Sequence, residues 1–301
     1  MSEIKFNHEF DFEYGVITKV APNIRRIVAR NPGPFTGPGT STYIIGNDEV
    51  CVLDPGPMLP EHVDAIVEGL QEEKVSQILV THTHIDHSPA SRLLKHQTGA
   101  PIFAFNAHSK HTAGALEGGV DREFEPDFEL EDGERVTGLG WELEAIHTPG
   151  HCSNHLCFSM KSNQVLFCGD HLMAWATTVI MPPDGSVRDY LTSLDKLEKH
   201  SESVFYPTHG APITDPSKYI KQVRTHRLER VLQVEAALGD GLQTLPQLRQ
   251  RIYPELPKAL NGGAELSILG SINYLSETGK LTQGSIPWTY PEPDVSEQCE
   301  K

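Results

Sequence analysis

The sequence has 301 residues and a formal net charge of −16, with 38% hydrophobic and 22% charged residues. This composition is typical of a globular chain long enough for two domains, and it excludes disordered and fibrous classes. No apolar run approaches the roughly 20 residues that span a bilayer. The polar N-terminus lacks a secretory signal pattern. Five scattered cysteines without a CxxC pair argue against a disulfide framework; they are Cys51, Cys152, Cys157, Cys168 and Cys299. We therefore expect a cytoplasmic protein.

The negative charge is concentrated in the first 214 residues, whereas residues 215–280 are close to neutral. An acidic surface repels long phosphate backbones unless bound metal or local basic patches offset it. The charge distribution weighs against a nucleic-acid substrate but does not exclude one.

The first two thirds of the chain consist of short apolar runs separated by turns. Helical spacing of apolar residues predicts helices over 62–71 and 189–200. A turn over 46–48 is expected to join the first two strands as a hairpin. Strands are expected over 40–46, 49–54, 76–84, 101–105, 141–148, 155–160, 164–170 and 203–210.

After residue 215 the pattern becomes helical. A long amphipathic helix is expected over 217–238, a short one over 244–254 with Pro246 near its start, and a third over 263–280, followed by a hairpin or wing. Three helices and a wing outline a winged-helix module. We therefore predict domains at 1–215 and 216–285, with a flexible tail at 286–301.

The segment THTHIDHS (81–88) carries the strongest chemical signal, because His82, His84, Asp86 and His87 directly follow a buried strand. Imidazole nitrogens and carboxylate oxygens are ligands for zinc, iron and manganese. Alternation on extended backbone places His82 and His84 on one side. Such a cluster can hold two ions roughly 3.5–4 Å apart. The alternative, a histidine-rich surface loop, is disfavoured by the position after a buried strand.

Four ligands cannot close two metal sites, so further ligands must come from other strand ends. An aspartate between two cations is a natural bridge, because one carboxylate can hold both. The candidates at the ends of later apolar runs are His147, His151, His155, Asp170 and His209.

The order of THTHIDH, TPGH, CGD and THG resembles the metallo-β-lactamase superfamily over residues 20–215. The resemblance implies an α/β, four-layer αββα sandwich with the site along one edge of the paired sheets. It implies two ligand sets: His82, His84 and His151 for a first metal; Asp86, His87 and His209 for a second; and Asp170 as the bridge. His147 and His155 would then support the ligands or be merely structural.

A narrower resemblance involves NPGPFTGPGTSTYIIG (31–46), HRLERVLQ (226–233) and the helical module after the last ligand. These features are similar to the β-lactamase-like-protein subgroup with a C-terminal winged helix. Some members of that subgroup are single-strand-specific endoribonucleases, and many are uncharacterised hydrolases.

Two divalent cations, zinc before iron or manganese, would lower the pKa of a shared water from about 15.7 towards 7. The resulting bridging hydroxide would attack a carbonyl or a phosphorus. Asp86 is the candidate to orient it and to handle its proton. Cys168 is expected to be a buried strand residue rather than a nucleophile. Thr177 and Thr178 either line the pocket or are polar loop residues without a functional role.

The preferred substrate is a small carbonyl compound such as a thioester or lactone, which the acidic first domain favours. The alternative is a single-stranded RNA endonuclease. It would use the basic residues of the long helix, namely Lys218, Lys221, Arg224, Arg227 and Arg230. A β-lactamase and a non-enzymatic winged-helix regulator are further alternatives. The helical module could also serve as a lid, a scaffold or a homodimer contact. No membrane partner is expected.

Overall fold

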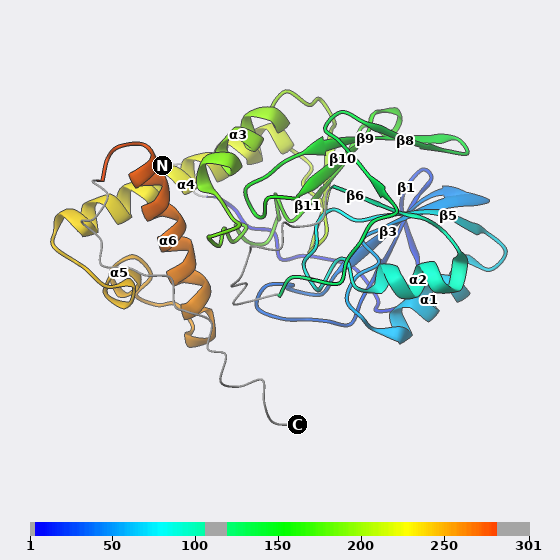
Figure 1. Ribbon diagram of the computed structural model, residues 1–301, viewed down its shortest axis with the longest axis horizontal. Helices are drawn as coiled ribbons and strands as arrows, with labels where there is room; N and C mark the ends of the chain where they lie inside the picture. The colour runs from blue at the N-terminus through cyan, green and yellow to red at the C-terminus, as the bar shows by residue number, and fades with distance from the viewer. Residues whose placement is uncertain (1–3, 106–118, 282–301) are drawn as a thin grey trace.

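The computed structural model describes residues 4–105 and 119–281. Two β-sheets lie face to face, with helices on their outer sides (Figure 1). The first sheet runs in the order β1-β2-β3-β4-β5-β6-β7 and the second in the order β12-β11-β10-β9-β8. The first sheet consists of β1 (Thr18–Ala21), β2 (Ile24–Val28), β3 (Ser41–Asn47), β4 (Glu49–Leu53), β5 (Lys74–Leu79), β6 (Ile102–Ala104) and β7 (Phe128–Glu129). The second consists of β8 (Arg135–Gly138), β9 (Trp141–His147), β10 (Leu156–Met160), β11 (Val165–Gly169) and β12 (Val204–Pro207).

Parallel connections bring several strand ends to one edge. Helix α1 (Pro60–Leu70) connects β4 to the parallel β5, and α2 (Ala90–Thr98) connects β5 to the parallel β6. In the second sheet, α3 (Val187–Leu197) lies between the parallel β11 and β12. Strands β9 and β11 both pair antiparallel with β10, so they share one direction. Polar residues that follow these strands therefore meet at one edge.

Three apolar clusters hold the layers together. One packs α1 and α2 on the outer face of the first sheet, with Val63, Ile66 and Leu94 fully buried. A second fills the space between the sheets and includes Tyr43 and Phe158. The third extends from the outer face of the second sheet through α3 into the C-terminal helices. Helix, sheet, sheet and helix thus form the four expected layers.

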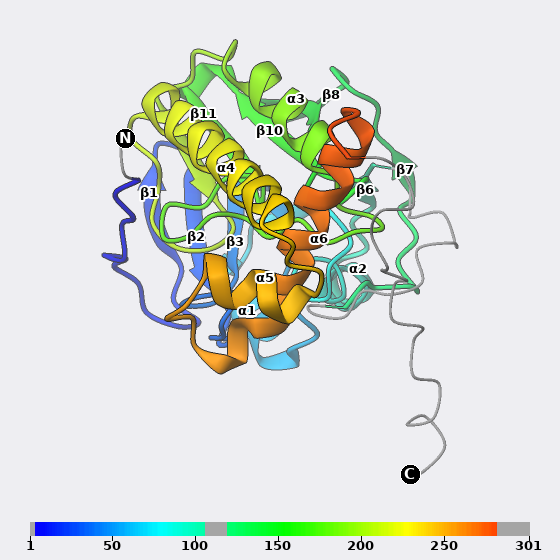
Figure 2. The same cartoon turned by 90° about the vertical axis from the view of Figure 1, so that its left-hand side faces the viewer.

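The C-terminal segment forms α4 (Pro216–Gly239), α5 (Leu245–Ile252) and α6 (Asn261–Glu277), with short 3₁₀ turns at Lys258–Leu260 and, earlier in the chain, at Lys161–Asn163. Helix α4 contacts both α3 and α6, as Figure 2 shows. Thr244 caps α5 in a reciprocal capping box with Gln247. The expected wing and the tail at 286–301 lie largely or wholly beyond the described residues. The winged helix and the domain boundary therefore stay predictions.

The strands depart from expectation in two ways. Strands β1, β2, β7 and β8 were not anticipated, partly because Arg26 is buried inside β2 and breaks the apolar pattern. Strand β5 ends at Leu79 rather than at residue 84, because the backbone N–H of Thr81 donates to Oδ1 of Asp54 instead of to a neighbouring strand. The histidine-rich segment is therefore a loop after the strand.

The four cysteines among the described residues are free and buried; Cys299 lies outside them. Cys168 lies inside β11, as expected of a strand residue. No helix within 4–105 or 119–281 combines the length and the apolar character needed to cross a membrane.

Candidate metal centre

Three imidazoles converge at the edge of the sandwich. Nδ1 of His84 lies 2.8 Å from Nε2 of His82 and 3.0 Å from Nε2 of His151. All three side chains are buried, and His151 comes from the segment that follows β9. Nitrogens bound to one tetrahedral zinc ion at about 2.0–2.1 Å stand roughly 3.3 Å apart. This first cluster therefore has nearly the spacing that one ion requires.

A second cluster of Asp86, His87, Asp170 and His209 lies beside it. Nε2 of His209 is 3.1 Å from Oδ2 of Asp86 and 3.4 Å from Oδ1 of Asp170. Nε2 of His87 is 3.5 Å from a carboxylate oxygen of each aspartate. Oδ2 of Asp170 is also 3.8 Å from Nε2 of His151 in the first cluster. Asp170 thus touches both clusters, as a bridging carboxylate must.

Several polar atoms of the second cluster are buried without a hydrogen-bond partner: Nε2 of His87, Nε2 of His209 and Oδ1 of Asp170. Their contacts have the distances of ion pairs but not the geometry of hydrogen bonds. A buried polar atom left unsatisfied costs about 1–3 kcal/mol. Cations bound by these atoms would remove that cost, so the two clusters fit two divalent metal ions. The mixed nitrogen and oxygen donors suit zinc, iron and manganese alike.

The remaining ring nitrogens fix the orientation of the imidazoles. Nδ1 of His209 lies 3.1 Å from the carbonyl oxygen of Gly39, and Nδ1 of His151 lies 2.7 Å from that of Val179. Nδ1 of His87 lies 3.0 Å from Oδ2 of Asp54. Each ring therefore turns Nε2 towards its cluster, which is the arrangement that metal-binding histidines generally need.

Asp54 is a functional residue that the sequence reasoning missed. It is buried, and its carboxylate accepts hydrogen bonds from the backbone N–H and the hydroxyl of Thr81, both at 2.8 Å, and from the hydroxyl of Thr208 at 3.0 Å. It thereby joins β4 to the segments that carry His82 and His209. Its position at the end of an apolar strand, before Pro55-Gly56, was the available signal.

The two clusters differ in charge. Burial, reinforced by the neighbouring imidazoles, lowers the pKa of His84 to about 3 and that of His82 well below 6.5. Burial also opposes the charged form of His209, but Asp170 and Asp86 outweigh it and raise its pKa to about 10. Burial likewise opposes the charged form of His87, but Asp86, Asp170 and Asp54 outweigh it and raise its pKa well above 6.5. Without metal, His82 and His84 of the first cluster are therefore neutral, whereas the second cluster is a set of ion pairs.

His155 and His147, the two candidate histidines without an assigned ligand role, lie in different surroundings. Nε2 of His155 accepts a hydrogen bond from the backbone N–H of Asp170 at 3.1 Å, so His155 supports a candidate ligand. His147 instead stacks on Phe105 and contacts the carbonyl oxygen of Ser153, away from both clusters.

A pocket of about 340 Å³ opens onto both clusters through His84, Asp86, His151 and Asp170. Most of its remaining wall is apolar and comes from four parts of the chain: Pro32, Pro34 and Phe35; Pro57; Ile85; and Met173, Val179 and Met181. Asn31 and Thr36 are the polar side chains that the described residues add outside the clusters. Thr178 does not line the pocket. It lies buried behind His151, with its hydroxyl 3.2 Å from Nδ1, and Thr177 does not line the pocket either.

Paired His/Asp clusters at the strand ends of a two-sheet sandwich define a metal-binding hydrolase. Residues 35–209 match the metallo-beta-lactamase superfamily, and the chain belongs to that family. The resemblance seen in the sequence is thereby confirmed.

The chain is 29% identical over 253 residues to an atrochrysone carboxyl ACP thioesterase of Aspergillus chevalieri, covering 80% of this chain and 77% of that one. It is 28% identical over 253 residues to a beta-lactamase-like protein 2 homolog of Caenorhabditis elegans, covering 81% of each. A crystal structure of a beta-lactamase domain protein from Burkholderia ambifaria shares the fold, with a TM-score of 0.76, 20% identity and 91% of each chain covered.

Proposed function

We propose that the protein is a binuclear, zinc-dependent thioesterase that acts on an acyl group with substantial apolar surface. The observation that carries this proposal is the pocket, whose wall beside the clusters is apolar and, within the described residues, contains no Lys or Arg. Such a wall binds an acyl chain by removing its surface from water, at about 25 cal/mol per Å². It offers no cation to a phosphate backbone.

The nature of the leaving group supports a thioester over a lactone or an amide. Outside the two clusters, none of the described pocket residues has a titratable side chain. Outside the clusters, the described pocket wall therefore offers no general acid to protonate a strongly basic leaving group. A thiol has a pKa of about 8.5, so a thiolate departs without a proton, whereas an alkoxide or an amine anion does not. The thioesterase name of one relative points the same way.

Two divalent ions, when bound, would supply a Lewis acid and a water of lowered pKa. The side chains have distinct tasks around them. Burial acts to raise the pKa of Asp86, but His87 and His209 hold it well below 3.8. Asp86 therefore stays ionised and accepts a hydrogen bond that orients the attacking water. Asp170 stays ionised for the same reason and joins the two clusters.

The five basic residues of α4 do not form a continuous unpaired cationic face. Arg227 is buried, Arg224 pairs with Asp195 and Glu198, Lys221 pairs with Glu198, and Arg230 lies over the Tyr253 ring. Lys218 is exposed, and a single lysine without an ion pair among the described residues does not favour RNA over a thioester.

Substrate class is tested with matched compounds that share one apolar acyl group. The panel consists of a thioester, an oxygen ester, a lactone, a β-lactam, a phosphodiester and single-stranded RNA. We expect kcat/KM for the thioester to exceed that for the oxygen ester at least about 100-fold, because only the thiol leaves unassisted. Activity should vanish with a chelator and return with zinc. Cleavage of RNA alone would overturn the proposal.

The two-ion site is tested by elemental analysis of the purified protein. We expect close to two ions per chain, with a clear loss in His87→Ala and Asp170→Ala. His147→Ala is the matched control, because His147 lies outside both clusters. Full metal content in both ligand variants would refute the site assignment.

A further inference from the structure

Arg227 is a buried cation whose role the proposed reaction does not explain. It lies on α4, is 4% exposed, and has no ion-pair partner among the described residues. Nη2 donates to the carbonyl oxygen of Thr178 at 2.6 Å, and Nη1 donates to the hydroxyl of Ser267 on α6 at 3.3 Å. A buried charge without a counter-ion is costly. The short, charge-assisted bond to Thr178 is therefore its principal stabilising contact.

The carbonyl that Arg227 binds belongs to the loop that orients a candidate metal ligand. Nδ1 of His151 lies 2.7 Å from the carbonyl oxygen of the next residue, Val179, and 3.2 Å from the hydroxyl of Thr178. Fixing the Thr178 carbonyl therefore fixes both groups that set the rotation of the His151 ring. The guanidinium and the ring of His151 therefore contact the carbonyl oxygens of two consecutive residues, Thr178 and Val179.

A second contact connects the same arginine with the bridging aspartate. The guanidinium carbon lies 5.5 Å from the centre of the Tyr190 ring. The hydroxyl of Tyr190 donates to the carbonyl oxygen of His171, which directly follows Asp170, at 3.0 Å. Backbone and Cβ atoms of Tyr190 also lie so close to Gly150, the residue before His151, that a Cβ there would come within 2.4 Å.

Helix α4 holds this loop at two points on one face. Two turns before Arg227, the hydroxyl of Tyr219 donates to the carbonyl oxygen of Met173 at 2.5 Å. Residues 219, 223 and 227 recur every four positions, so all three point to the same side of the helix. Met173 and Val179, at the two ends of the held segment, line the pocket.

We propose that Arg227 is a positioning residue for the first metal cluster, through which the C-terminal helices form part of the active site. It holds the 173–179 loop so that Nε2 of His151 faces His84. The inference rests on the two-ion site of the proposed function.

The test compares metal affinity in the full-length wild type, Arg227→Met, Arg227→Lys and Arg224→Met. Zinc is titrated against a chromophoric chelator, and thermal unfolding of each metal-free variant is recorded alongside. Arg224→Met is the matched control, since it removes the same charge one turn earlier on α4 and breaks contacts to Asp195 and Glu198 but none to the loop. Substituting groups that orient metal ligands typically weakens metal affinity 10–100-fold.

We expect Arg227→Met to fold and to bind one of its two zinc ions about 10–100-fold more weakly. Arg227→Lys should be intermediate, because an ammonium retains the charge but not the planar fork that reaches two acceptors. Arg224→Met should match the wild type. Wild-type affinity for both ions in Arg227→Met or, should that variant not fold, in Arg227→Lys would overturn the inference. Failure of both variants to fold would also overturn it, because it would assign Arg227 to the fold. A wild type without zinc affinity would instead refute the proposed function.

Discussion

His155 sets the position of Asp170: its Nε2 accepts the backbone N–H of Asp170 at 3.1 Å, while Nδ1 lies 2.8 Å from the hydroxyl of Thr148. The ring must therefore be neutral with its proton on Nδ1, because Nε2 acts as an acceptor. Burial and the nearby imidazoles of His171 and His151 keep its pKa well below 6.5, which maintains that state at neutral pH. A neutral histidine thus holds the carboxylate that touches both clusters.

Replacing His155 by Phe should weaken zinc binding about 10–100-fold, because the backbone that aims the Asp170 carboxylate loses its acceptor. The free energy of unfolding should also fall by about 1–3 kcal/mol, since a buried N–H is left unpaired. Chelator competition and urea unfolding measure the two effects. His147→Phe is the control and should retain wild-type zinc affinity. Equal affinities in the two variants would show that His155 has no such role.

Gly169→Ala should damage the site far more than Gly133→Ala does. Both glycines have positive φ, +51° and +81°, so alanine strains the backbone by roughly 1 kcal/mol in either case. At Gly169 an added Cβ would also lie 2.5 Å from Nε2 of His155, whereas nothing lies within 4 Å at Gly133. We expect an additional loss of roughly 2 kcal/mol or more, together with reduced zinc content. Urea unfolding that shows similar losses for the two variants would contradict this contact.

Metal binding to the second cluster should release protons, because its two histidines are protonated before metal binds. At pH 7 His209, with a pKa of about 10, and His87 are protonated in the metal-free protein, while His82 and His84 are neutral. Protons compete with metal for the imidazoles of His209 and His87, whose pKa values are raised. Metal affinity should therefore rise with pH until about pH 10, by about tenfold per pH unit for each proton displaced.

Calorimetric titration in two buffers of different ionisation enthalpy measures this proton release. His84→Ala isolates the second cluster and His209→Ala isolates the first. The binding heat should depend on the buffer in His84→Ala and much less in His209→Ala. Buffer-independent heats in His84→Ala would show that its imidazoles are neutral before metal binds.

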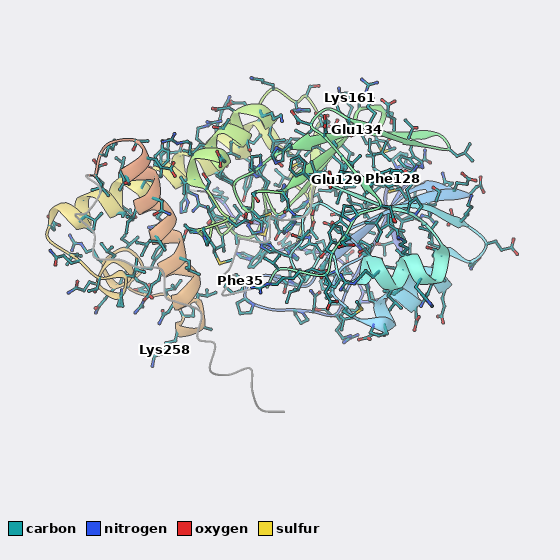
Figure 3. All side chains as sticks on the ribbon, in the orientation of Figure 1. Phe35, Phe128, Glu129, Glu134, Lys161 and Lys258 are labelled. Atoms are coloured by element: carbon teal, nitrogen blue, oxygen red, sulfur yellow. The ribbon has the colours of Figure 1, made fainter. Side chains whose placement is uncertain are left out.

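Phe35→Ala should reduce preference for long apolar acyl groups. Phe35 lies on the pocket wall formed by residues 31–36. In the view of Figure 3 it is seen between the C-terminal helices and the first sheet. Loss of the ring should cost about 1–2 kcal/mol of binding to a chain that contacts it, or roughly 10-fold in kcat/KM. An acetyl thioester, which has almost no apolar chain to place against the ring, is the internal control. An equal loss for both substrates would mean that Phe35 stabilises the loop rather than the acyl chain.

Strand ends in the sequence offered nine candidate ligands, because the direction and alternation of strands are local properties. The resemblance to the metallo-β-lactamase superfamily then selected the seven that the structure gathers in the two clusters. The helices of the C-terminal segment were also predictable, since their apolar spacing and Pro246 near the start of the short helix are local signals.

Only the tertiary structure decided the roles of Asp54, His155 and Arg227. Asp54 binds side chains from the segments that follow β5 and β12, and Arg227 meets a loop about fifty residues earlier in the chain. In the sequence, Arg227 belongs to an evenly spaced basic row, which is what a solvated helix face also shows. Packing of α4 against α3 and α6 buries it beside the carbonyl oxygen of Thr178, because burial depends on which surfaces meet in space. The same holds for the pocket, whose apolar wall is assembled from four separate parts of the chain.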